Sequence, residues 1–322
     1  MIISSLKGNN YLVIFLFLMM ISNYLFVAGK YFFFEKNAIS SVPINYEILD
    51  NSSEDFSLKE IESDSITLSN EMLGIFEKYN FTIESFINNS YENLVVFSSL
   101  PDDFLLLEPA RLKKNLFIKT ILPIIFLENE RVLAERKKIL EWWTETDGEQ
   151  INKEFWPEWL KKISQKYSFD GENIGNLLMR IDIIPISLAI SQAAIESGWG
   201  SSRYAREGNA IFGQYTYDNE TGLIPKDRSD EKTFLIKKFL TLSDSVESYI
   251  KNLNTHNAYS DFRKRRKDLR MNGENISGDL LSEKLLNYSE RRELYVKDIK
   301  DVMKINNFLK FDKIYKTQKL MN

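Results

Sequence analysis

The chain contains no cysteine and a single histidine among its 322 residues. Without cysteine, disulfide bridges, thiolate-bound structural zinc and cysteine nucleophiles are all excluded. A single histidine, His256, likewise excludes metal sites built from several histidines. We therefore expect neither a bound metal ion nor a cofactor.

The chain also has no excess of positive charge, since 42 Lys and Arg residues stand against 46 Asp and Glu residues. Nucleic-acid-binding proteins usually present a basic surface, so we expect no nucleic-acid partner. The one basic cluster, RKRRK at residues 263–267, is expected to lie on a solvated helix face. Its alternative role is contact with anionic lipid headgroups or with the carboxylates of peptidoglycan stem peptides. The sequence shows no Walker-type loop, no HExxH and no GxSxG motif.

An uncharged apolar run occupies residues 11–28, YLVIFLFLMMISNYLFVA, and follows Lys7. Its length lies between that of a signal-peptide core and the about 20 residues of a spanning helix. The small residues at 27–29 favour cleavage, whereas the apolar residues 31–34 favour an uncleaved anchor. Either alternative places the rest of the chain outside the cytoplasm, in the cell envelope on the periplasmic side.

The composition changes twice along the remaining chain. Residues 37–100 are rich in Ser, Asn, Asp and Glu without a sustained period, which is typical of a tether or a small adapter. From Pro109 onwards aliphatic residues recur at helical spacing. Pro123 is expected to interrupt the first helix, and Glu128 and Arg136 are expected to face outward. We therefore assign a signal peptide or membrane anchor to residues 1–30, a tether or adapter to 31–104 and the main domain to 105–315.

The main domain is predicted to be mainly α-helical with a small β-hairpin lobe. A strong helix is predicted over residues 186–197, because Pro185 suits a first turn and Gly198 suits a C-terminal cap. Between residues 211 and 239 the pattern alternates and contains Gly, Pro and Asn, which predicts the β-hairpin lobe. Helical patterns then return up to residue 309.

Glu196 stands at the end of the 186–197 helix, after a run of small and aliphatic residues. Partial burial among such residues raises the pKa of a carboxyl group, as a general acid requires. Helical spacing places Gln192 on the same face as Glu196, while Trp199 offers an apolar surface. Asn209 and Gln214 provide amides suited to hydroxyl and N-acetyl groups. This set of residue types indicates a carbohydrate site, although a lone Glu at a helix end is otherwise an ordinary solvated residue.

The stretch AISQAAIESGWGSSRYAREGNAIFGQYTY, residues 189–217, resembles the glucosaminidase domain of peptidoglycan hydrolases. This is the glycoside hydrolase 73 type, also described as mannosyl-glycoprotein endo-β-N-acetylglucosaminidase-like, and it includes flagellar muramidases and autolysins. The resemblance extends to the Bax-like bacterial envelope proteins over residues 105–310. The segments that carry it are FIKTILPIIFLENERVLAERKKIL, LNTHNAYSDFRKRRKDLR and LNYSERRELYVKDIKDVM.

The resemblance implies a lysozyme-like helical domain that cleaves the β-1,4 bond between N-acetylglucosamine and N-acetylmuramic acid in peptidoglycan glycan strands. Glu196 matches the catalytic acid. Among the carboxylates of the predicted lobe (Asp218, Glu220, Asp230 and Glu231), Glu231 is the preferred second one. Alternatively the substrate's own N-acetyl carbonyl acts as the nucleophile, with Tyr259 or Asn209 orienting it. The expected substrate-binding residues are Gln192, Trp199, Asn209, Phe212 and Gln214.

Two other functions fit the same sequence. A lytic transglycosylase uses one acid/base Glu and forms an anhydro product. A non-catalytic scaffold keeps the cleft and binds glycan without needing an ionisable group at position 196. In each case the partners are glycan strands and, if residues 11–28 are not cleaved, the inner membrane.

Overall fold

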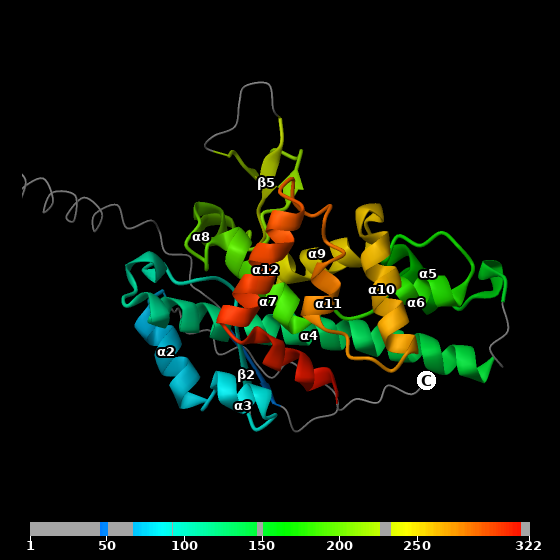
Figure 1. Ribbon diagram of the computed structural model, residues 1–322, viewed down its shortest axis with the longest axis horizontal. Helices are drawn as coiled ribbons and strands as arrows, with labels where there is room; N and C mark the ends of the chain where they lie inside the picture. Colours follow the sequence, from blue (N-terminus) through cyan, green and yellow to red (C-terminus); the bar gives the residue numbers. More distant parts are fainter. Residues whose placement is uncertain (1–45, 51–66, 92, 147–150, 226–232, 317–322) are drawn as a thin grey trace, which may run out of the picture. The chain divides into compact units, whose positions relative to one another are not determined.

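The computed structural model describes residues 46–50, 67–91, 93–146, 151–225 and 233–316, which are mainly helical with two small antiparallel sheets (Figure 1). This confirms the prediction of a mainly α protein with a small β-lobe. Within these residues no helix combines the length and apolar content needed to cross a membrane. The predicted anchor at residues 11–28 and the alternatives for its cleavage lie outside the described residues.

The N-terminal elements of the described chain, called the N-terminal module here, belong to the same compact unit as the rest. The module consists of β1 (Tyr46–Asp50), α2 (Ser69–Lys78), α3 (Ile83–Ile87), β2 (Asn93–Phe97) and the 3-10 turn η1 (Phe104–Leu106). Strands β1 and β2 pair antiparallel, and β2 packs against the long helix that follows. Aromatic rings fill the core of the module, including Phe76, which stacks on Phe81 at 5.5 Å between centroids. Part of the region predicted as tether or adapter is therefore folded, while residues 31–45 and 51–66 lie outside the described residues.

The remaining elements form the helical body. They are α4 (Ala110–Glu145), η2 (Lys153–Phe155), α5 (Glu158–Lys166), α6 (Ile174–Arg180), α7 (Ile186–Ser197), α8 (Arg203–Gly208), α9 (Leu242–Thr255), η3 (Asn257–Tyr259), α10 (Ser260–Met271), α11 (Gly278–Ser282), α12 (Glu293–Ile305) and η4 (Phe308–Lys316). The strands β3 (Tyr215–Thr216), β4 (Gly222–Leu223) and β5 (Leu235–Lys237) form the β-lobe in the order β3-β5-β4.

Helix α4 is continuous through Pro123, so the predicted interruption is wrong. A proline inside a helix removes one backbone hydrogen bond and costs about 3 kcal/mol. The flanking residues Ile121, Leu122, Ile124 and Ile125 are almost completely buried, because α7, α9 and β2 all pack against α4. Burying each such side chain contributes about 1.5–3 kcal/mol, which together outweighs the cost of the proline.

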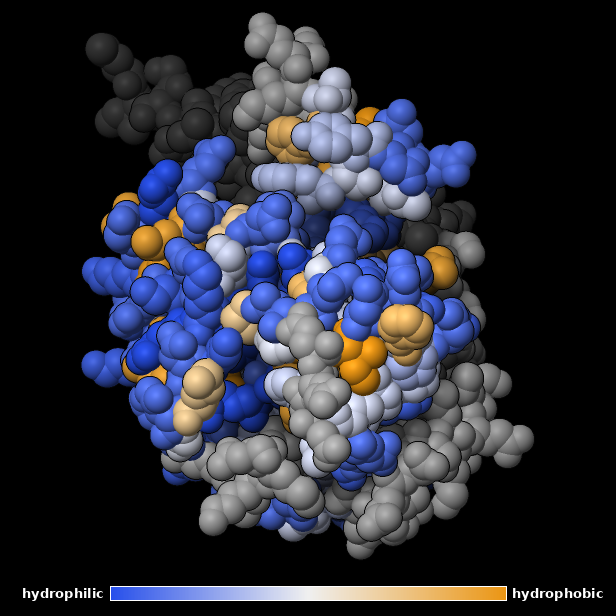
Figure 2. All heavy atoms as spheres, turned by 90° about the vertical axis from the view of Figure 1, so that its right-hand side faces the viewer, coloured by the Kyte–Doolittle hydropathy of each residue, from blue (hydrophilic) through white to orange (hydrophobic). Residues whose placement is uncertain are grey.

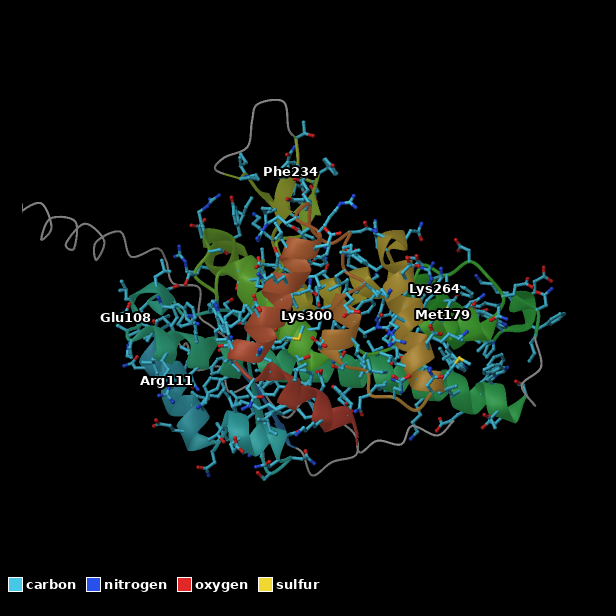
Figure 3. All side chains as sticks on the ribbon, in the orientation of Figure 1. Glu108, Arg111, Met179, Phe234, Lys264 and Lys300 are labelled. Atoms are coloured by element: carbon cyan, nitrogen blue, oxygen red, sulfur yellow. The ribbon has the colours of Figure 1, made fainter. Side chains whose placement is uncertain are left out.

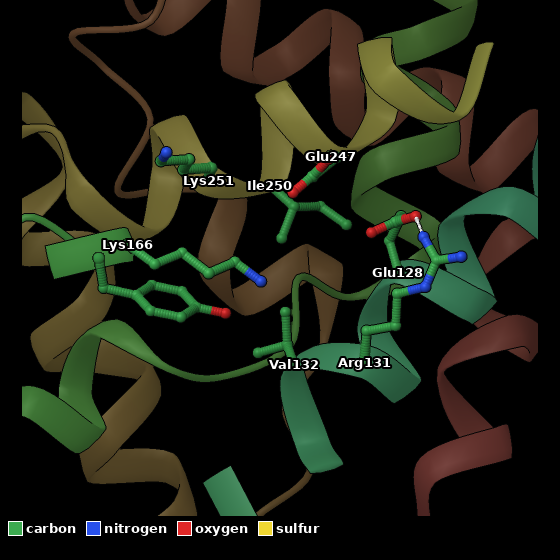
Figure 4. A pocket seen from close by; sticks show the side chains of 8 residues that line it. Glu128, Arg131, Val132, Lys166, Glu247, Ile250 and Lys251 are labelled. Carbon is green, nitrogen blue, oxygen red and sulfur yellow. Dashed lines mark hydrogen bonds and ion pairs between the residues drawn. The ribbon is translucent and has the colours of Figure 1, made fainter. Parts of the chain in front are cut away.

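The burial of α4 on several sides also overturns the outward placement of Glu128 and Arg136. Glu128 is 5% exposed and lines a small pocket between α4, α5 and α9, where it is bonded to Arg131 (Figure 4). Burial raises the pKa of Glu128 to about 7 although Arg131 opposes the shift. The Arg136 guanidinium donates to the carbonyl oxygens of Leu178 and Ile181.

The basic run at residues 263–267 is only partly a solvated face. Lys264 and Lys267 are exposed, as predicted. Arg266 is fully buried and donates to the carbonyl oxygens of Met179 in α6 and of Asp182 and Ile183, which lie between α6 and α7. Arg263 is also buried, and its guanidinium donates to two carbonyl oxygens at the end of α9. On the face near α5 and α10, hydrophilic side chains surround a few separate hydrophobic patches (Figure 2).

Helix α7 has the predicted bounds, with Pro185 at its N-cap and Gly198 at its C-cap in the left-handed conformation (φ 57°). It is surrounded by α4, α11, α12 and η4. Pro185 provides no side-chain cap, and Asp312 of η4 takes that role by accepting hydrogen bonds from the Ser187 amide at 3.0 Å and hydroxyl at 2.7 Å. A carboxylate at a helix N-terminus is favourable, so the C-terminal segment holds the first turn of α7 in place.

Candidate active site

Glu196 lies in the last turn of α7 and is partly buried. The Tyr295 hydroxyl, which α12 positions, donates a hydrogen bond to Glu196 Oε1 at 2.6 Å. Burial raises the pKa of the Glu196 carboxyl, and the hydrogen bond from Tyr295 opposes this shift without cancelling it. The environment therefore favours the protonated carboxyl more than water does.

A directional chain of hydrogen bonds ends at Glu196. The Tyr249 hydroxyl of α9 donates to Gln192 Oε1 at 2.7 Å, and Gln192 Nε2 donates to the Tyr295 oxygen at 3.0 Å. Because Tyr295 accepts from Gln192, its own proton is directed at Glu196 Oε1. Oε1 is thereby engaged as an acceptor, which leaves Oε2 to carry the proton of a protonated carboxyl.

Gly213, between α8 and β3, lies beside this second oxygen. A Cβ atom at position 213 would lie 3.9 Å from Glu196 Oε2. The residue has φ +59°, in the left-handed region that side chains disfavour. The backbone at Gly213 thus lies beside the carboxylate with no side chain between them.

We expect Gly213→Ala to lower kcat. The loss should be larger than in a control variant that is destabilised to the same extent. The left-handed conformation costs about 1–2 kcal/mol for a residue with a Cβ atom, and the added methyl group narrows the space at Oε2. Gly273→Ala is the matched control, since Gly273 has φ +67° and a Cβ atom added there would meet nothing within 4 Å. Thermal unfolding should shift similarly for both variants, whereas kcat should fall only for Gly213→Ala. Equal kcat values in the two variants would show that the space between position 213 and Glu196 Oε2 does not matter for catalysis.

Aromatic rings form the apolar surroundings of Glu196. Tyr288 stacks on Tyr295 at 5.4 Å with nearly parallel planes, and Tyr259 lies beside Tyr288 at 6.0 Å. On the other side Phe212 stacks on Tyr249 at 3.8 Å. The hydrogen bond to Glu196 thus comes from Tyr295, while the Tyr259 hydroxyl interacts with Asn252 and lies close enough for the charge of Glu196 to affect its pKa. Phe212 and Tyr259 are almost fully buried.

The other predicted substrate-binding residues have structural partners. Trp199 is partly buried and packs between Phe117 and Phe308 with Lys114 over its ring, so its ring lies against the core between α4 and η4. Gln192 is fully buried and supports Tyr295. Two further amides attach the β-lobe to the body.

These two amides are the side chains of Asn209 and Gln214. Asn209 Nδ2 donates to the carbonyl oxygens of Phe239 and Leu240, and Gln214 Nε2 donates to the Ser248 carbonyl oxygen of α9. The nitrogen donors expected to bind a sugar are therefore engaged within the protein. Their positions hold the segment that contains Gly213.

Of the four β-lobe carboxylates predicted as a second catalytic group, the structure describes Asp218 and Glu220, and both are exposed. Glu231, the preferred candidate, and Asp230 lie outside the described residues. Asp218 is exposed and accepts hydrogen bonds from the Thr221 hydroxyl and the Glu220 amide, which lower its pKa and fit a role in the turn. Glu220 is exposed in the same turn.

The residues missed by the sequence reasoning are Tyr249, Tyr288 and Tyr295. Tyr249 and Tyr295 occur in helices with ordinary amphipathic spacing, where an aromatic residue indicates only a buried face. Tyr295 lies 99 residues after Glu196. Only the packing of α12 on α7 brings the two together.

The residues of this site lie within a segment that is similar to a known family. Residues 172–308 match the glucosaminidase family model, described as mannosyl-glycoprotein endo-beta-N-acetylglucosaminidase. The chain is similar to Protein bax of Escherichia coli strain K12, with 33% identity over 198 residues, which cover 57% of this chain and 66% of that protein. The chain thus aligns with just under two thirds of its relative.

Among solved structures, the catalytic domain of the autolysin Auto from Listeria monocytogenes is similar at 18% identity, covering 53% of this chain and 97% of that one. The TM-score of 0.32 is too low to establish a shared fold. The family match contains Glu196, Gly213, Tyr249 and Tyr295. Residues 172–308 of this chain thus match the glucosaminidase family, and the chain is similar to Protein bax.

Proposed function

We propose that this protein is a peptidoglycan hydrolase that cleaves the β-1,4 bond between N-acetylglucosamine and N-acetylmuramic acid, with Glu196 as the general acid. The family supports a glycosidase in general. The observation that carries the residue assignment is the environment of Glu196, whose carboxyl is partly buried, has a raised pKa and is held by Tyr295. Such a carboxyl holds its proton more readily than an exposed one and can give it to a glycosidic oxygen.

The hydrogen-bond directions support a specific proton position. Tyr295 engages Oε1, so the proton of Glu196 resides on Oε2, next to Gly213. The glycosidic oxygen approaches from that side, receives the proton and leaves as a hydroxyl group. As the bond breaks, positive charge develops on the sugar ring, and the resulting Glu196 carboxylate then lies close to it.

Two alternatives are proposed for the nucleophile that attacks the sugar carbon. Glu231 would activate a water molecule, or the N-acetyl carbonyl of the substrate would act as the nucleophile. A lytic transglycosylase would use Glu196 alone for both proton transfers. The products distinguish these routes, because hydrolysis gives a reducing end and transglycosylation an anhydro-muramyl end.

The test uses the full chain and purified peptidoglycan, with the released fragments identified by mass spectrometry. Fragments with a reducing N-acetylglucosamine end support the proposal. Anhydro-muramyl ends would assign the protein to the transglycosylases. No released fragments, together with co-sedimentation on intact sacculi, would identify a glycan-binding scaffold.

The proposed substrate lies in the cell wall, so we also propose that the domain acts outside the cytoplasm, with residues 11–28 as its signal peptide or anchor.

We expect Tyr295→Phe to move the alkaline limb of the pH–activity profile to higher pH. The hydrogen bond from Tyr295 stabilises the charged form of Glu196 and lowers its pKa, so its loss raises that pKa further. The general acid is active when protonated, and a higher pKa keeps it protonated at higher pH.

The maximal kcat of Tyr295→Phe should also fall, because Glu196 loses its fixed orientation. Tyr79→Phe, at the end of α2 in the N-terminal module, serves as the matched control and should leave the profile unchanged. An alkaline limb that stays in place or moves to lower pH in Tyr295→Phe would refute the assignment.

A further inference from the structure

The β-lobe exposes aromatic rings that none of the roles assigned above uses. Tyr215, the first residue of β3, is 66% exposed, and its ring centroid lies 4.6 Å from that of Phe234 with the planes tilted by 52°. Phe234 immediately precedes β5 and lies on the lobe (Figure 3). Single exposed apolar residues are common, but here a second ring supports the first on a small lobe.

The strand pairing directs both rings to one face of the lobe. Tyr215 is paired with Ile236 across the β3–β5 ladder, and directly paired residues share a face. Phe234 lies two residues before Ile236, and side chains two residues apart in an extended chain also share a face. The contact between the two rings agrees with this placement.

The segment that leads into β3 starts beside the proposed catalytic carboxyl. Tyr215 is two residues beyond Gly213, whose backbone lies beside Glu196 Oε2. Two extended residues span at most about 7 Å, so the Tyr215 backbone starts within that distance of Gly213. A polymeric substrate that lies on Glu196 and extends towards the lobe therefore reaches Tyr215 with a neighbouring sugar.

We propose that Tyr215, supported by Phe234, forms a sugar-binding subsite. Its ring stacks against a sugar of the glycan strand that neighbours the glycosidic bond cleaved at Glu196. The proposal rests on the proposed function, since it takes the glycan as the ligand. A tyrosine ring with one side exposed to solvent can bind a sugar. The C–H groups of the sugar ring pack on the aromatic face, while its hydroxyl groups remain in water. Contact with Phe234 restricts Tyr215, which reduces the entropy that Tyr215 loses when the sugar binds.

The subsite predicts a specific kinetic pattern. A contact made away from the reacting bond contributes equally to substrate and transition-state binding, so its loss raises KM and leaves kcat nearly unchanged. We expect Tyr215→Ala to raise KM for long, peptide-free glycan strands by about tenfold, the size of a typical aromatic anchor. Tyr215→Phe should change KM little, because the ring rather than the hydroxyl group makes the contact. Phe234→Ala should give a smaller increase.

The experiment compares these variants of the full chain with Phe155→Ala, which removes a 77% exposed aromatic side chain from η2 in the helical body. Each variant is first checked for unchanged thermal unfolding. A KM raised about tenfold in Tyr215→Ala, with Phe155→Ala equal to wild type, supports the subsite. Equal KM values for Tyr215→Ala and Phe155→Ala overturn it while leaving the proposed hydrolysis intact.

A binding measurement separates failure of the subsite from failure of the proposed function. Dissociation constants for the same glycan strands are measured by calorimetry in a Glu196→Gln background, with and without Tyr215→Ala. If the wild-type protein cleaves no glycan but Tyr215→Ala still weakens binding, the subsite stands and the hydrolase proposal falls. If the strands do not bind, or bind equally to both proteins, the subsite is refuted.

Discussion

Replacing Glu196 by glutamine is expected to lower kcat on peptidoglycan by about 10²–10⁴-fold, the usual contribution of a positioned general acid. Glutamine has nearly the same shape and can still accept the Tyr295 hydrogen bond, but it has no acidic proton for the leaving oxygen. Because burial raises the pKa of Glu196, the wild-type carboxyl keeps that proton to a higher pH than an exposed carboxyl does. The measurement is the initial rate of release of soluble glycan fragments at saturating substrate.

Glu207→Gln is the matched control, since it makes the same chemical change on α8, where Glu207 is exposed and paired with Arg203. Its rate should equal that of the wild type. Glu196→Gln should retain binding to sacculi and an unchanged unfolding temperature, which shows that the loss concerns chemistry. Activity in Glu196→Gln that stays close to that of the wild type would exclude Glu196 as the general acid.

Replacing Asp182 by asparagine is expected to destabilise the fold by about 3–5 kcal/mol, the cost of removing one partner from a buried ion pair. Asp182 is 2% exposed and accepts two hydrogen bonds from the Arg270 guanidinium, with Arg136 at 3.9 Å. Arg266 is also close, and its guanidinium is held by the carbonyl oxygens around Asp182. Without the carboxylate these guanidinium groups remain close together without their shared counter-charge. Urea unfolding followed by circular dichroism measures the change.

The pH dependence of stability provides a second measurement on Asp182. Burial would raise the pKa of its carboxyl, but the guanidinium groups of Arg136 and Arg270 outweigh burial and lower it to about 2, from 3.8 in the unfolded chain. A lowered folded-state pKa means that the contribution is fully present above pH 3.8 and is lost as the pH falls through about 2. The difference in unfolding free energy between wild type and Asp182→Asn should therefore be constant near neutral pH and shrink towards pH 2.

Asp261→Asn controls for the loss of an ordinary charge, because Asp261 is exposed and paired with Lys264. Its effect on stability should be below about 1 kcal/mol. If Asp182→Asn destabilised the protein no more than Asp261→Asn, the cluster around Asp182 would contribute no net stability. Loss of the difference at alkaline rather than acidic pH would show that a basic group, not Asp182, controls it.

The sequence by itself determined those features that depend on neighbouring residues. Pro185 and Gly198 set the ends of α7, because proline suits a first turn and glycine adopts the left-handed cap at no steric cost. Alternation with turn residues was enough to predict the β-lobe, and the stretch around Glu196 was enough to identify the glucosaminidase domain. Glycine at 213, beside the carboxylate, also belongs to that stretch.

Tertiary structure alone decided the partners of those residues. Helical periodicity shows which face of a helix is buried but not what it packs against, so it could not reveal that Tyr295 would meet Glu196 or that Trp199 would pack against Phe117. The same limit explains α4, whose proline and inward-facing Glu128 and Arg136 are tolerated because helices from later in the chain cover it. Arg263 and Arg266 were expected to be surface charges, but carbonyl oxygens from other segments surround them. Burial and hydrogen bonding between residues far apart in sequence are properties of the assembled chain, because each group's surroundings form only when separate helices pack together.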